Sequence, residues 1–138
     1  MSEDNLTDLL HYRIKQAYET LNEAGILLKE NALRGSVNRS YYAMFYALLA
    51  LLSTKQMGTS KHSGAISLFD KDFVKKDIFP KEMSQILRIA FDRRHTGDYG
   101  EMIEIDVKTA ETAYYDSESF IKKIEEYLET QNFFKKEK

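Results

Sequence analysis

The sequence predicts an all-α fold, an antiparallel up-and-down bundle of four main helices plus one short helix. Apolar residues recur every three or four positions along most of the chain. No segment shows the sustained alternation that is typical of a strand, and the short connections favour antiparallel neighbours. With 138 residues, of which 43% are hydrophobic, we expect one helical domain over residues 1–138, with a tail that frays from about residue 131.

The first two predicted helices carry the clearest apolar stripes. From Asn5 to Lys29 the stripe follows one face, and charged residues fill the other. After an interruption at residues 31–35, a second stripe begins at Val37 and ends before residues 54–59. Aromatic and leucine side chains also occupy the other faces of this second helix, so we expect it to be the central, most buried element.

Three further helices are predicted after residue 60. A short one carries Ile66 and Phe69. Pro80 suits the first turn of the next helix, which runs to about Arg94, because its missing N–H would have no partner there. Asp106 is placed to cap the last long helix. The side chains of that helix expected to face inward are Val107, Ala110, Tyr114, Ile121, Ile124 and Leu128.

The composition excludes several classes of function. The formal charge of -2 argues against the broad positive field of a general nucleic-acid binder, so any phosphate contact has to be local. The chain has no cysteine, and its three histidines lie far apart, so we expect no metal site and no cofactor. The longest apolar run is too short to cross a bilayer, and no secretion signal is found. We therefore expect a cytoplasmic protein that has no membrane partner.

A cluster of charged residues lies at the end of the fourth predicted helix. Arg94 follows Ala90 by four positions, so a cation stands where the apolar stripe predicts a buried residue. Such an arginine is either paired within the fold, with Asp98 as the nearest partner, or part of an anion site. We favour the anion site, because antiparallel packing would bring this helix end to the start of the central helix.

The start of the central helix carries tyrosine rings and a second arginine, which would face the charged end of the fourth helix. Arg39, Tyr42 and Tyr46 share one face, and arginines among tyrosines can hold a phosphate and stack a base. The predicted phosphate-binding or nucleotide-binding residues are Arg39, Tyr42, Tyr46, His62, Arg93, Arg94 and Tyr99. The predicted catalytic residues are Arg94, His95 and Asp98, since two neighbouring arginines would keep the imidazole of His95 neutral and able to act as a base.

Each of these residues also has a purely structural interpretation. Arginines on helices commonly form salt bridges, and Arg94 has Asp98 nearby in sequence. The tyrosines of a buried helix commonly belong to the core and have a satisfied hydroxyl group. His62 and His95 can equally be surface residues without a role.

Three motifs together resemble those of the HEPN domains. They are Arg39 to Phe45 (RSYYAMF), Lys61 to Gly64 (KHSG), and Arg94 with Asp98 and Tyr99. The resemblance spans about residues 8–128. It implies an all-α bundle that forms a homodimer and is often encoded beside a minimal nucleotidyltransferase. Several members are metal-independent ribonuclease toxins, in which an arginine is followed after four to six residues by a histidine.

This chain departs from that nuclease motif. Glycine, aspartate and tyrosine occupy the positions where the histidine is expected, and Arg94 with Asp98 and Tyr99 matches a variant found in one branch of the family. The resemblance therefore implies, first, a subunit that binds a nucleotide or an RNA phosphate and works with a minimal nucleotidyltransferase in a toxin-antitoxin-like pair. Such a partner would modify Tyr99 if it acts covalently on this chain.

Two other functions stay open. One is a metal-independent endoribonuclease toxin that acts through Arg94 with His95 or His62 as the base. The other is a non-catalytic, dimeric interaction bundle whose tyrosines form the interface.

Overall fold

The computed structural model describes residues 3–55, 61–99 and 104–133, and within these ranges it is all-α with no strand, as predicted. For residues 3, 4 and 95–99 it describes the backbone only. The helices are α1 (Glu3–Lys29), α2 (Leu33–Ser53), α3 (His62–Phe69), α4 (Lys81–Tyr99) and α5 (Val107–Thr130), and a short π-helix, η1 (Asp70–Val74), continues α3.

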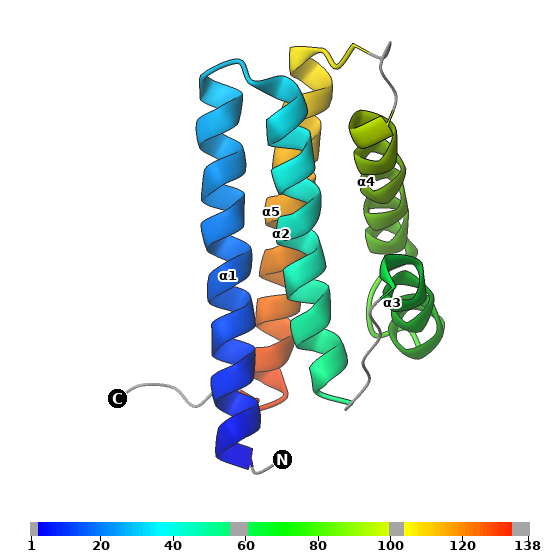
Figure 1. Cartoon of the computed structure of the whole chain (residues 1–138). Coiled ribbons are helices and arrows are strands. Elements are labelled where there is room, and N and C mark those ends of the chain that lie inside the picture. The colour runs from blue at the N-terminus through cyan, green and yellow to red at the C-terminus, as the bar shows by residue number, and fades with distance from the viewer. Residues whose placement is uncertain (1–2, 56–60, 100–103, 134–138) are drawn as a thin grey trace.

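The helix α2 is the central element of the bundle, as predicted. It packs against α1, α3, α4 and α5, and residues on all of its faces are buried. Figure 1 shows α1 on one side of α2, α3 and α4 on the other, and α5 behind α2. The helices α2 and α4 run in opposite directions, so the end of α4 lies at the level of the start of α2 (Figure 1). This antiparallel arrangement places the charged end of α4 beside the tyrosines of α2.

The connection between α1 and α2 is shorter than the predicted interruption at residues 31–35. Asn31 has a φ of 62°, a left-handed conformation that ends α1, and α2 already begins at Leu33. Gly35 therefore lies inside α2, where a Cβ atom would come within 3.3 Å of Leu27 Cδ1. The glycine suits this turn of α2 because α1 and α2 approach each other closely at this point.

The last helix begins as predicted, and Ala110, Ile121, Ile124 and Leu128 are buried as expected. The side chain of Asp106 accepts a hydrogen bond from the backbone N–H of Thr109 at 2.8 Å, which confirms the predicted cap. Val107 is 46% exposed, because it lies in the first turn, so the prediction that it faces inward is wrong. Ser117 is fully buried instead, and its hydroxyl donates to the carbonyl of Ser40, which holds α5 close to α2.

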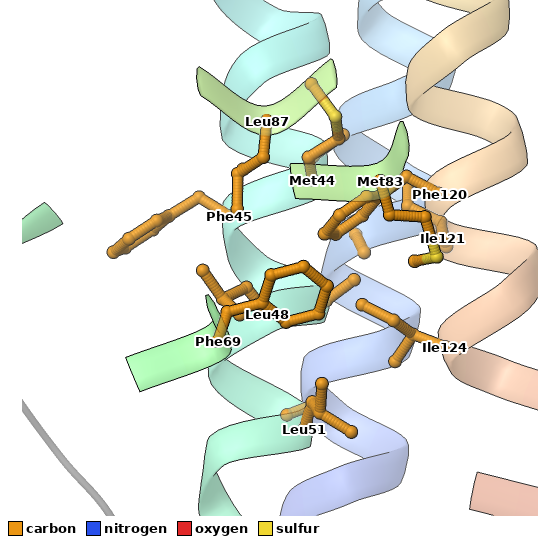
Figure 2. Close-up of a cluster of buried hydrophobic side chains, with 14 of the residues drawn as sticks. Met44, Phe45, Leu48, Leu51, Phe69, Met83, Leu87, Phe120, Ile121 and Ile124 are labelled. Carbon is orange, nitrogen blue, oxygen red and sulfur yellow. The ribbon is translucent and has the colours of Figure 1, made fainter. Parts of the chain in front are cut away.

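The main core cluster lies between α2 and the other helices, and a second, small cluster joins Val37 of α2 to Ala110 and Ala113 of α5. Figure 2 shows the main cluster around Leu48, with Phe69 from α3, Leu87 from α4 and Ile124 from α5. Phe45 belongs to the same cluster, but its ring extends away from the centre in Figure 2. This ring marks the edge of the core that faces the site described below.

The chain is packed beyond the predicted start of fraying at about residue 131. The backbone N–H of Phe133 donates to the carbonyl of Leu128 at 3.0 Å, and Thr7 Oγ1 donates to the carbonyl of Phe133 at 3.3 Å. Residues 134–138 lie outside the described part of the chain. None of the described helices is both long and apolar enough to cross a membrane.

Candidate functional site

Arg94 of α4 and Tyr42 of α2 lie together, as the predicted antiparallel packing requires. Arg94 Nη1 donates to the hydroxyl of Tyr42 at 3.4 Å. The guanidinium carbon Cζ lies 5.3 Å from the ring centroid of Tyr41, 5.8 Å from that of Tyr42 and 5.5 Å from that of Phe91. The positive charge of Arg94 is therefore surrounded by aromatic rings, a favourable environment for a guanidinium group.

His62 joins the same group from the start of α3. Its Nδ1 lies 2.6 Å from the hydroxyl oxygen of Tyr41, which is fully buried. The ring of Phe45 stacks on the imidazole with centroids 3.9 Å apart and an interplanar angle of 13°, and Tyr42 meets it edge-on at 5.8 Å. We call Tyr41, Tyr42, Phe45, His62, Phe91 and Arg94 the Arg94 cluster.

The hydrogen bond between Tyr41 and His62 bears on which ring nitrogen carries the proton. Burial raises the pKa of the Tyr41 hydroxyl, although Arg94 opposes the shift, so this hydroxyl keeps its proton and can donate it. Burial, and then the charge of Arg94, lower the pKa of His62. A neutral imidazole that accepts at Nδ1 carries its own proton on Nε2. We infer that His62 presents an uncharged N–H donor beside Arg94.

Arg39 and Tyr46 lie at the margin of the cluster. Arg39 donates to Asn38 Oδ1 from Nε at 3.2 Å and from Nη2 at 3.0 Å. Its Nη1 lies 3.8 Å from Glu23 Oε1 in an exposed ion pair, and its Cζ lies 5.0 Å from the ring centroid of Tyr42. The rings of Tyr42 and Tyr46 have centroids 6.3 Å apart. Exposed ion pairs contribute little, so Arg39 can exchange Glu23 for another anion.

Arg93 faces another side of α4. It lines a narrow hollow together with Ala113 and Asp116 of α5, among other residues. Burial raises the pKa of Asp116, and the charge of Arg93 partly offsets that shift. Successive residues on a helix point in different directions, so the structure separates Arg93 from Arg94, although the sequence predicts both as phosphate-binding residues.

The predicted residues His95, Asp98 and Tyr99 cannot be placed in the site. The helix α4 continues to Tyr99, beyond its predicted end near Arg94. The side chains of these three residues lie outside the described part of the chain, and so does the predicted pairing of Asp98 with Arg94. Their assignment stays a prediction.

Three residues of the cluster, Tyr41, Phe45 and Phe91, are not among the predicted site residues. Tyr41 and Phe45 lie on the central helix α2, where aromatic residues are expected in the core, and both are buried. Their contact with His62 joins two helices, and helical periodicity contains no signal for that. Among the described residues, no group of three or more His, Asp or Glu side chains could hold a metal ion.

The lowered pKa of His62 predicts a loss of stability in acid. The unfolded chain takes up a proton at this residue below its ordinary pKa of 6.5, whereas the folded chain does so only at a lower pH. The free energy of unfolding should therefore decrease as the pH falls from 6.5 to the pKa of the folded state, and the contribution should then level off. Urea unfolding at about pH 7.5 and about pH 5 should show a smaller loss in His62→Gln.

The comparison variant is His11→Gln, which replaces an exposed histidine of α1 outside the Arg94 cluster. The loss of stability in acid should be smaller in His62→Gln than in this variant. If His62→Gln also loses as much, the neutral state of His62 is not what the folded structure maintains.

The chain is similar to known proteins over most of its length. The HEPN domain model matches residues 10–127, which include α2, α3, α4 and the whole Arg94 cluster. A UPF0332 protein of Thermotoga maritima is 38% identical over 121 residues, which cover 88% of this chain and 92% of that protein.

Two proteins of Methanocaldococcus jannaschii are also similar. The one named "Putative toxin MJ0142" is 34% identical over 90% of this chain and 84% of its own length. The one named "Putative toxin MJ0605" is 32% identical over 83% of this chain and 85% of its own length. A family model over most of the chain, together with relatives matched over most of their lengths, leads to one conclusion: this chain belongs to the HEPN domain family.

Proposed function

We propose that this protein is a homodimeric HEPN subunit that binds a nucleotide or an RNA phosphate at the Arg94 cluster. We further propose that it works with a minimal nucleotidyltransferase in a toxin-antitoxin-like pair. The observation that carries the first proposal is the position of the Arg94 guanidinium, which is partly buried among the rings of Tyr41, Tyr42 and Phe91.

The Arg94 cluster has the chemistry of an anion site. Arg94 contributes a permanent positive charge, and His62 contributes a neutral donor at Nε2. A charge-assisted hydrogen bond to a phosphate oxygen is stronger than one between neutral groups, and the surrounding rings lower the local dielectric. None of the six residues of the cluster is acidic, so nothing within it repels a phosphate. Arg39 is near enough to Tyr42 to add a second positive charge at the margin.

The names of two relatives support the second part of the proposal. Both Methanocaldococcus jannaschii proteins carry the words "Putative toxin" in their names and match most of this chain. A toxin-like role for this chain fits a site that binds nucleotides or RNA. The partner would then act on, or cover, the surface that carries Arg94.

The test is a titration of the purified protein with nucleoside monophosphates, inorganic pyrophosphate and single-stranded RNA. Calorimetry should show saturable binding that weakens with added salt, since phosphate contacts are salt-dependent. Nuclear magnetic resonance should place the largest shift changes at Tyr42, His62 and Arg94. Absence of binding by all of these ligands, or shift changes confined to other surfaces, would contradict the proposal.

A second candidate is a metal-independent endoribonuclease, and one observation favours it. Arg94 and His62 are far apart in sequence but belong to one cluster, so a cation and an imidazole can reach the same phosphate. A general base, however, needs a free lone pair at Nε2, whereas the bond from Tyr41 leaves the proton there. Cleavage of single-stranded RNA in excess chelator that is lost in His62→Gln would favour the nuclease over the binding subunit.

A further inference from the structure

A hollow of about 210 Å³ lies between α3 and α4, next to the Arg94 cluster. Its lining residues are Ser63, Ile66 and Ser67 from α3, and Arg88, Phe91 and Asp92 from α4. Phe91 also belongs to the Arg94 cluster, and Ser63 directly follows His62 in the first turn of α3. The hollow and the cluster are therefore neighbouring parts of one surface. We call this space the α3–α4 hollow.

A hydrogen-bonded network holds the arginine of the hollow in place. Arg88 Nη2 pairs with Asp70 Oδ2, and Asp70 Oδ1 accepts from the hydroxyl of Ser84. Asp70 is the first residue of η1, and π-helical turns are frequently found at functional sites. The carboxylate of Asp70 balances the charge of Arg88, so the guanidinium can offer N–H groups to the hollow without making it strongly positive.

Asp92 gives the hollow an acceptor. It is exposed, and its carboxylate forms no hydrogen bond or ion pair with any residue in the described ranges. A carboxylate repels phosphate, so this hollow does not suit a second phosphate. It suits an uncharged, planar group with N–H donors, which could lie against the ring of Phe91 and meet the hydroxyls of Ser63 and Ser67.

We propose that the α3–α4 hollow binds the base of the nucleotide whose phosphate lies at the Arg94 cluster, and that it selects guanine. The inference rests on the proposed function. Guanine carries two adjacent N–H donors on one edge, which match the two oxygens of Asp92. It also carries two acceptors, O6 and N7, and arginine is the side chain that most often binds them. Adenine has a ring lone pair beside its amino group, and that lone pair would face the carboxylate.

The experiment compares ligands with and without a base. Calorimetry should show that GMP binds about tenfold more tightly than AMP, CMP or UMP, since one bidentate contact discriminates by this much. Asp92→Asn should remove this preference, and Ser67→Leu, which fills the hollow, should weaken the binding of all four nucleotides. Neither substitution should weaken the binding of inorganic pyrophosphate. Both positions are exposed, so the fold should be kept, and Glu126→Gln on α5 is the matched charge control.

Two RNA strands identify the source of the base. If RNA is the ligand, an oligouridylate with one guanine should bind more tightly than the same strand without it. If only GMP shows the preference, the ligand is a free nucleotide. Either result supports a guanine site.

The remaining outcomes separate this inference from the proposed function. Equal binding of all four nucleotides, with pyrophosphate still bound, would overturn the α3–α4 hollow as a base site and leave the Arg94 site intact. A guanine preference that survives both Asp92→Asn and Ser67→Leu would also overturn it. If neither pyrophosphate nor any nucleotide or RNA binds, both proposals fail.

Discussion

Replacing Arg94 with alanine is expected to weaken the binding of pyrophosphate, nucleotides and RNA by about 10-fold to 100-fold. A hydrogen bond to a charged group contributes about 1.5–3 kcal/mol, and about 1.4 kcal/mol corresponds to a factor of ten in affinity. Within the cluster the guanidinium contacts the hydroxyl of Tyr42 and three rings, and the side chain is only partly buried, so its removal should leave the helices in place. Calorimetry at a fixed salt concentration measures the effect.

The neighbouring arginine offers a matched control for this prediction. Arg93→Ala removes the same charge from the same helix, but its side chain faces Asp116 of α5. Affinity should change little in this variant. Equal losses in Arg93→Ala and Arg94→Ala would indicate a general electrostatic attraction, and no loss in either would remove Arg94 from the site.

Replacing Phe69 with alanine is expected to lower the free energy of unfolding by about 3–5 kcal/mol. Its side chain is fully buried, and the rings of Phe73, Phe79 and Phe120 lie with their centroids 5.7–6.2 Å away. Truncation leaves a cavity that these rings can fill only partly. Phe69 also anchors α3 in the core, and His62 is the first residue of this helix. The position of His62 should therefore be less well defined in the variant, and pyrophosphate should bind more weakly. Urea denaturation gives the stability, and calorimetry the affinity.

An exposed aromatic residue supplies the control for the stability measurement. Tyr115 of α5 is 61% exposed, so Tyr115→Ala should change the free energy of unfolding far less than Phe69→Ala. If the two variants are equally stable, α3 is not anchored through Phe69.

Most of the helical fold could be predicted because each helix leaves a local pattern. The stripes of α1 and α2, the proline before α4 and the cap at Asp106 all involve residues within a few positions of one another. The predictions were wrong at positions whose conformation or burial depends on residues that are close in space but distant in sequence. Gly35 resembles a helix breaker in the sequence, but it lies inside α2, where a Cβ atom would make a tight contact of 3.3 Å with Leu27 Cδ1 of α1. Val107 follows the pattern of the buried stripe, but it is the first residue of α5, and too few side chains pack against it there to bury it.

The site was predictable only in part, for the same reason. Arg94 departs from the apolar stripe of α4, and the opposite directions of α2 and α4 place it beside Tyr42, so sequence reasoning could find this pair. Arg93 has the same chemistry as Arg94 and differs only in the side of the helix that it occupies. Periodicity alone did not separate the two functionally.

The sequence by itself determined the all-α class, the central position of α2 and the membership in the HEPN family. Those features depend on periodic burial and on short motifs, and both are visible in residues that are close together in the sequence. Only the tertiary structure decided that His62 bonds Tyr41 and that the α3–α4 hollow adjoins the Arg94 cluster. These contacts join residues from different helices, and the packing of the core, rather than any local preference of the chain, determines the distances between them.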